Sequence, residues 1–157
     1  MKNCQMNRKT RMALACCLFL LTPPMAAAEP DNVPADARQL VVMPDAARAI
    51  MRSDMLDHLA ALNEITGYLA EKNLEAAAET AEQRIGNSAI GKHAAMARGQ
   101  GPGRFMPDAM RQLGWGMHSA ASEFALVVKQ GDQASTYAAL QKIMSSCVAC
   151  HMSFRTR

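Results

Sequence analysis

A C-x-x-C-H run at residues 147–151, close to the end of the chain, restricts the possible folds more than any other feature. This spacing is the attachment signature of c-type haem, in which the histidine becomes an axial iron ligand. Zinc binding would need two further ligands at suitable spacing, and a thioredoxin-like site would need a nearby βαβ pattern. The sequence offers neither. The motif therefore predicts one covalently attached haem c, held by Cys147 and Cys150, with His151 as the proximal iron ligand.

Residues 1–28 have the layout of a secretory signal. A segment with four Lys or Arg residues precedes the apolar run MALACCLFLL, and an Ala-Ala-Ala cleavage site ends at Ala28. The apolar run is about half as long as a membrane span. We therefore expect cleavage after about Ala28 and export to the periplasm, which leaves residues 29–157 as the folded domain.

Loss of this signal changes the charge and the cysteine count. The whole chain has 17 basic and 14 acidic side chains, and the signal holds four basic and no acidic ones, which leaves 13 against 14. A nearly neutral domain gives no electrostatic support for binding nucleic acid. The only cysteines left are the two in the haem motif, so no stray disulfide competes with haem attachment in an oxidising compartment.

The sequence predicts four helices and no strand. Apolar residues recur at helical spacing over residues 44–71, 73–85, 107–130 and 133 to beyond 151. Asp132 is expected to cap the last helix. Residues 86–104 are expected to form a glycine-rich connection with a short helical turn around residues 92–98. Short turns at two of the three joints favour an all-α fold, an antiparallel four-helix bundle with the haem motif on its last helix.

Several side chains outside the motif have competing interpretations. His58 interrupts the apolar stripe of the first helix and is expected to be a hydrogen-bonded core residue or a haem propionate partner. His118 is expected to pack beside the haem or to bond to another helix, and His93 is expected to be exposed. The methionines outside the first helix are scattered along the chain and do not form the clustered thioether tract expected of a copper carrier.

The chain resembles the cytochrome c′ family of c-type haem four-helix bundles. The resemblance rests on a haem motif close to the C-terminus, a methionine-bearing first helix, and the segments FALVVKQGD and CVACHMSFR. In this family an aromatic and a basic residue follow the motif, as Phe154 and Arg155 do here. The resemblance implies that Arg155 lies near a haem propionate. It also implies, from an arginine-then-methionine pattern in the first helix, that Arg52 and Met55 contact the cofactor.

The resemblance leaves the sixth iron ligand open, and this ligand separates two functions. Family members with a methionine in this position carry electrons, because Met–His ligation favours electron transfer. Members that leave the position empty bind nitric oxide or carbon monoxide. Met55 is the preferred sixth ligand here. Met51, His58 and an empty position remain the alternatives.

The preferred function is therefore that of a periplasmic electron carrier, which passes single electrons between exported or membrane-bound redox proteins and catalyses no bond chemistry. One alternative is a five-coordinate, gas-binding cytochrome c′. Another is a haem-free helical interaction module, in which the C-x-x-C-H run would be accidental. The family resemblance also permits a homodimer formed through the first two helices.

Overall fold

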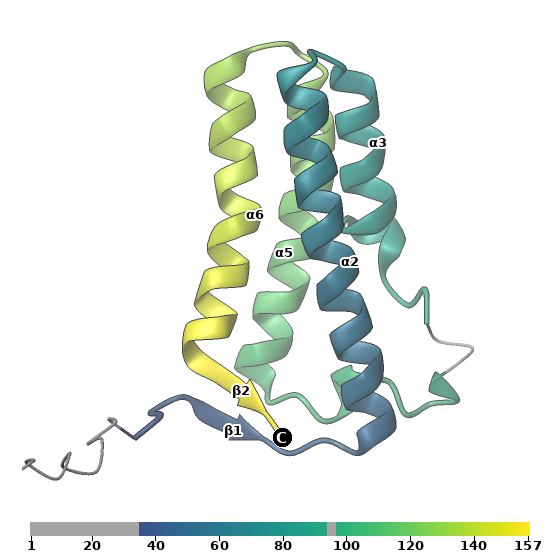
Figure 1. Cartoon of the computed structure of the whole chain (residues 1–157), viewed down its shortest axis with the longest axis vertical. Coiled ribbons are helices and arrows are strands. Elements are labelled where there is room, and N and C mark those ends of the chain that lie inside the picture. The colour runs from purple at the N-terminus through teal and green to yellow at the C-terminus, as the bar shows by residue number, and fades with distance from the viewer. Residues whose placement is uncertain (1–34, 94–96) are drawn as a thin grey trace, which may run out of the picture. The chain divides into compact units, whose positions relative to one another are not determined.

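The computed structural model describes residues 35–93 and 97–157 (Figure 1). The predicted signal, residues 1–28, lies outside the described residues. The helices and strands of the described part belong to one compact unit, Ala37–Arg157. In chain order they are β1 (Gln39–Val41), α2 (Asp45–Ala70), α3 (Leu74–Arg84), the 3₁₀ turns η1 (Asn87–Ala89) and η2 (Pro102–Arg104), α5 (Asp108–Val128), α6 (Gln133–Ser153) and β2 (Phe154–Thr156).

The helices α2, α3, α5 and α6 confirm the predicted all-α four-helix bundle, and their ends agree with local signals. Pro44 immediately precedes α2, and Asp45 places a negative charge at the positive end of that helix. The side chain of Asp132 accepts a hydrogen bond from the backbone nitrogen of Ser135 at 2.7 Å, which confirms the predicted cap of α6. Within the described residues, no helix is long and apolar enough to cross a membrane.

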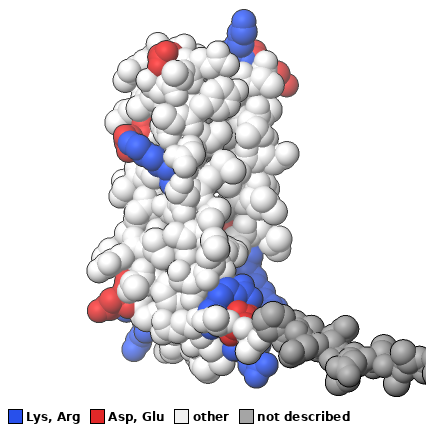
Figure 2. Space-filling model, turned by 90° about the vertical axis from the view of Figure 1, so that its left-hand side faces the viewer, with Lys and Arg blue, Asp and Glu red and all other residues white. Residues whose placement is uncertain are grey.

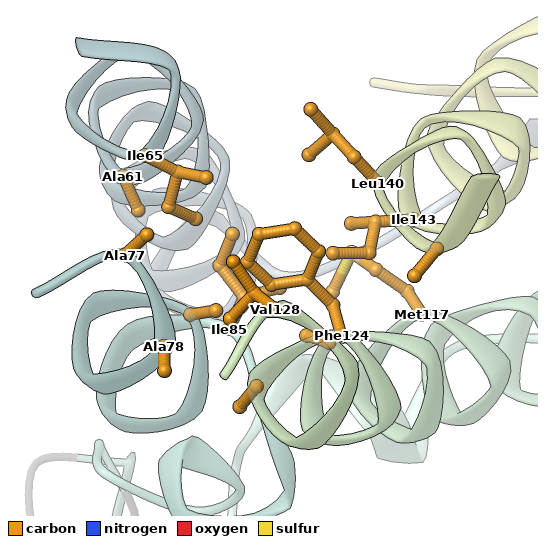
Figure 3. Close-up of a cluster of buried hydrophobic side chains, with 14 residues drawn as sticks. Ala61, Ile65, Ala77, Ala78, Ile85, Met117, Phe124, Val128, Leu140 and Ile143 are labelled. Atoms are coloured by element: carbon orange, nitrogen blue, oxygen red, sulfur yellow. The ribbon is translucent and has the colours of Figure 1, made fainter. Parts of the chain in front are cut away.

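The central core lies between the four helices. Close packing joins α2 to α3, α3 to α5, and α5 to α6, whereas α2 and α6 are not closely packed. Figure 3 shows Ile65 of α2, Phe124 of α5 and Ile143 of α6 pointing into the space between the helices. These three side chains are fully buried. Alanines fill the buried side of α3, so this short helix can approach α2 and α5 closely.

A short parallel sheet joins the two ends of the unit, and the prediction of no strand is therefore wrong. β1 pairs with β2, with Gln39 opposite Phe154 and Val41 opposite Thr156. Three-residue strands are too short to show an alternating pattern, and these two lie at opposite ends of the domain. A second buried cluster, here called the end cluster, consists of Val41, Met43, Ala47, Met110 and Phe154.

The third joint of the bundle is long because α3 is short. α3 has 11 residues, whereas α2 has 26 and α5 and α6 have 21 each. The connection between α3 and α5 contains η1 and η2, and the turn predicted around residues 92–98 lies partly outside the described residues. The connection lies in the half of the bundle into which α3 does not extend. The haem motif lies in this same half of the bundle (Figure 1).

Candidate functional site

The haem motif lies in the last turns of α6, with both cysteines on the inner side of the helix. Cys147 packs against the central core, and its Sγ lies 4.0 Å from Sδ of Met117. Cys150 packs against the end cluster. Both thiols are free and half-buried, and burial raises the pKa of each. The two cysteines, one turn apart, thus each border a different apolar cluster.

Ion pairs show which side of α2 faces α3. Arg84, at the end of α3, binds Asp57 and Glu64 of α2, each at 2.6 Å. Residues two positions apart in a helix lie on nearly opposite sides, because each residue turns the chain by about 100°. Met55 and Leu59, each two positions from Asp57, therefore lie on the side of α2 that faces away from α3, towards α6.

An ion pair likewise shows which side of α6 faces α5. Lys142 of α6 binds Glu123 of α5 at 2.6 Å. Met144 is two positions from Lys142, so it lies on the side away from α5, and Val148 and His151 follow it at spacings of four and three. All three side chains are exposed. His151, the predicted proximal ligand, therefore lies on the side of α6 that faces α2.

The facing sides of α2 and α6 expose apolar side chains. Leu59 of α2 is 66% exposed, and Met144 and Val148 of α6 are exposed as well. We call these three residues the apolar α2–α6 face. Figure 2 looks onto the α6 side of the molecule and shows few charged side chains over its middle. A flat apolar cofactor attached to α6 would cover side chains of this kind.

A cavity of about 720 Å³ lies between α2, the connection and α5, in the half of the bundle that carries the haem motif. This volume falls in the range of small-molecule sites, about 300–1,000 Å³. Among the described residues, those that line the cavity include none from α6. Its thioether and imidazole side chains are those of Met51, Met55, Met106, Met117, His58, His93 and His118.

Two of these histidines meet in the cavity wall. His58 of α2 is 7% exposed, and its ring centroid lies 6.0 Å from that of His118 on α5, with the ring planes at 84°. Nδ1 of His118 lies 2.5 Å from the carbonyl oxygen of Ile85, so we assign its proton to this nitrogen and leave Nε2 without one. Ile85 is the residue that caps the end of α3, so this contact confirms the prediction that His118 bonds to another helix.

His58 is buried, but within the described residues its Nδ1 has no hydrogen-bond partner. This differs from the predicted hydrogen-bonded core histidine. Burial lowers the pKa of His58 to about 4, and the charges of Lys92 and His118 act in the same direction. His58 is therefore neutral at pH 7, with an unsatisfied nitrogen in a buried wall.

His93 is half-buried, and the prediction that it is exposed is wrong. Its Nε2 lies 2.9 Å from Oδ1 of Asp54 on α2. Burial raises the pKa of Asp54, against the opposing charges of His93 and Lys92. Lys92 binds Asp57 at 2.7 Å. These pairs join the connection to α2. They explain why His93 is partly covered, although it lies in a glycine-rich segment that was expected to be an open loop.

The two arginines predicted to contact haem do not line the cavity. Arg52 is exposed on α2 and shares a side of that helix with Met55, three residues on. Arg155 is half-buried in β2, opposite Leu40 of β1. Arg38, just before β1, donates a hydrogen bond from Nη1 to the backbone oxygen of His151 at 3.4 Å. The roles of Arg52 and Arg155 towards a haem remain predictions.

The residues around the motif fit a haem c. Cys147 and Cys150 are free, half-buried and one turn apart, as two thioether bonds to one porphyrin require. His151 is exposed on the side of α6 that faces α2, so its imidazole is available to an iron. The exposed apolar α2–α6 face supplies the surface that a porphyrin ring would cover.

These features define a class of protein, an all-α bundle whose last helix carries a c-type haem motif. The model of the family described as Cytochrome C' matches residues 106–155, which contain α5, α6 and the motif. The match confirms, over these residues, the predicted resemblance to the cytochrome c′ family, which implies a c-type haem protein with haem c as its cofactor. Searches of curated proteins and of solved structures found no significant match.

The sequence-based interpretation missed the grouping of side chains around the cavity. Met106, Met117 and His118 come from the connection and α5, and they meet Met55 and His58 of α2. Along the chain these methionines look scattered, because the two segments are separated by α3. The adjacent pair Met117 and His118, on the inner part of a predicted helix, was the one local signal of this grouping.

Proposed function

We propose that the protein is a periplasmic electron carrier with one haem c, attached through Cys147 and Cys150. His151 and Met55 are the residues that would bind its iron. When bound, the haem supplies an iron that gains and loses one electron. The protein catalyses no bond chemistry of its own and exchanges electrons with exported or membrane-bound redox proteins. Export follows from the predicted signal.

The position of Met55 on α2 carries this proposal. Met51 packs against the end cluster beside Cys150, and the ring of His58 lies against that of His118. Met55 belongs to neither buried cluster and is half-buried. It lies on the side of α2 that faces the helix with His151. Of the three candidate ligands, it is therefore the best placed to approach an iron from the side opposite His151.

A methionine in this position suits electron transfer. Met–His ligation raises the reduction potential of haem iron. Electron transfer also requires a haem that is held firmly and shielded from water. The central core and the end cluster would hold the two cysteines, and the apolar α2–α6 face would cover the ring.

Gas binding is the second candidate function, and the cavity beside Met55 favours it. If Met55 leaves the sixth position empty, this position adjoins about 720 Å³ of space whose lining includes thioether and imidazole groups. A diatomic ligand such as nitric oxide or carbon monoxide would have room there. In this case Met55 walls the pocket and does not bind the iron.

Optical spectra of the purified ferric and ferrous protein, with and without carbon monoxide, test the proposal. We expect a six-coordinate, low-spin spectrum that carbon monoxide does not change. Met55→Ala should convert it to a high-spin spectrum that responds to carbon monoxide. Met51→Ala is the matched control and should stay low-spin. A high-spin wild-type spectrum would rule out Met55 as the ligand and support gas binding.

A further inference from the structure

Charged side chains are divided unevenly between the two ends of the bundle. The strands β1 and β2, the starts of α2 and α5, and the last turn of α6 lie at one end (Figure 1). Within this end, residues 37–52, 102–111 and 154–157 contain seven arginines and two aspartates. We call it the arginine end, after Arg38, Arg48, Arg52, Arg104, Arg111, Arg155 and Arg157.

The two aspartates of these ranges do not cancel this charge. Asp45 pairs with Arg48, and Asp108 pairs with Arg111. Even when Asp36 is included, which directly precedes these ranges in the sequence, the arginines outnumber the aspartates by seven to three. Figure 2 shows Lys and Arg side chains gathered towards this lower end of the molecule. The arginine end therefore carries an excess of positive charge.

The opposite end has the opposite sign. Residues 67–83 and 126–136 contain the turns that join α2 to α3 and α5 to α6, and they hold five acidic and two basic side chains. The near neutrality of the whole domain thus conceals a separation of charge along the bundle. A field of this kind orients a charged partner before contact and raises its association rate.

The arginine end also exposes apolar side chains. Val42, which follows β1, is 72% exposed, and Met152, just before β2, is 75% exposed. Protein interfaces are enriched in methionine and arginine, with apolar contacts at the centre and polar groups at the rim. The exposed arginines of this end are Arg38, Arg52, Arg104 and Arg157.

This surface borders the haem motif. Met152 directly follows His151, and Nη1 of Arg38 donates a hydrogen bond to the backbone oxygen of His151 at 3.4 Å. Cys150 packs against the end cluster, which contains Val41 of β1 and Phe154 of β2. A molecule seated on the arginine end would therefore lie beside the residues that attach the haem.

We propose that the arginine end, with Val42 and Met152, is the docking surface for a redox protein that presents an acidic patch. One electron passes between the haem iron and the redox centre of that partner. This inference rests on the proposed electron transfer and adds the chemistry of the partner and the end of the bundle that it contacts.

The chemistry of the surface favours a protein over an anionic membrane. The guanidinium group is planar, and its N–H groups match the two oxygens of a carboxylate. An electron carrier must also bring its haem close to a second redox centre, and a lipid surface has none. Aspartate and glutamate side chains of a redox partner meet both conditions.

The first test is calorimetric titration of the haem-loaded protein with poly-L-glutamate, a soluble acidic polypeptide, at low ionic strength. The double variant Arg104→Gln and Arg157→Gln should weaken binding at least about threefold, because it removes two charges from the surface. The double variant Lys72→Gln and Lys129→Gln is the matched control. It removes two positive charges from the opposite end and should leave the affinity unchanged.

A second measurement needs only the wild type. Hexacyanoferrate(III), an anionic oxidant, takes one electron from the ferrous haem iron and becomes hexacyanoferrate(II). Because salt screens the attraction between the arginine end and this anion, the stopped-flow rate should fall as the ionic strength rises. A rate that is constant or that rises with ionic strength would overturn the proposal, and so would equal binding of poly-L-glutamate by the wild type and the arginine variant.

Vesicles of phosphatidylglycerol distinguish the other class of partner. If they bind the protein and poly-L-glutamate does not, the proposal is wrong and the arginine end contacts an anionic membrane. A high-spin haem that binds carbon monoxide would overturn the proposed electron transfer but would leave the binding of poly-L-glutamate unchanged. The two proposals therefore fail separately.

Discussion

At the scale of single residues, a few charged side chains mark which helix faces meet. Arg84 joins α3 to α2 through Asp57 and Glu64, and Lys92 joins the connection to Asp57. These contacts lie on the side of α2 opposite Met55. Asp57 therefore helps to hold α2 in place, although it lies on the side of this helix away from Met55.

We expect Asp57→Asn to lower the free energy of unfolding at pH 7 by about 1 kcal/mol, since the pairs are partly exposed and screened by solvent. Hydrogen bonds from Arg84 and Lys92 lower the pKa of Asp57 from 3.8 to about 2. A folded-state pKa below the unfolded value gives stability that is present above pH 4 or so and is lost as the pH falls towards about 2.

Urea unfolding between pH 7 and about 2.5 measures this effect. The wild type should lose more stability than Asp57→Asn across the acidic part of the range. Asp45→Asn removes a carboxylate that pairs with Arg48 at the exposed start of α2 and should have the smaller effect at pH 7. Parallel pH profiles for the wild type and Asp57→Asn would contradict this role of Asp57.

At the scale of elements, the end sheet and the short α3 shape the site. β1 and β2 join the residues before the bundle to those directly after the haem motif, and the end cluster beneath them contacts Cys150. Because α3 ends early, it does not extend into that half of the bundle. The cavity there is lined by α2, α5 and the described part of the connection.

The end sheet should contribute measurably to stability through Val41. Val41 is 4% exposed, whereas its neighbour Val42 is 72% exposed. Val41→Ala removes two buried methyl groups and should cost about 2 kcal/mol in the free energy of unfolding. Val42→Ala should change it by less than about 0.5 kcal/mol. Equal effects of the two substitutions on denaturant unfolding would show that the end cluster is not a stabilising contact.

At the scale of the whole molecule, the bundle is incomplete between α2 and α6. The other neighbouring helices pack closely, and the core between them is filled by residues such as Ile65 and Phe124. The facing sides of α2 and α6 keep apolar side chains exposed. The proposed haem would cover these side chains, so the cofactor would form part of the hydrophobic core.

A polar substitution on this face should therefore destabilise the haem-loaded protein. Leu59 and Leu126 are similarly exposed in the chain alone, at 66% and 71%. Leu59→Asn should lower the stability of the haem-loaded protein by about 2 kcal/mol, because Leu59 would lie against the ring. Leu126→Asn, on α5, should have an effect below about 0.5 kcal/mol. Thermal unfolding measures both, and equal losses would place the haem elsewhere.

Local spacing in the sequence was enough to predict the haem motif, the all-α class and the approximate bounds of the four helices. Each of these features depends on residues within a few turns of one another. The cap at Asp132 could also be predicted, because it depends on residues close to one another in the sequence. The preference for Met55 also began as a pattern within one helix, and it stays a prediction.

The remaining features depend on contacts between distant segments. β1 and β2 are too short to recognise until the chain ends meet, and His93 is covered because Asp54 lies beside it. His58 and His118 are 60 positions apart, and the packing of α2 beside α5 places both in the wall of one cavity. The spacing of donors along a helix is a local property, whereas the set of donors that surrounds a cavity depends on how the helices pack.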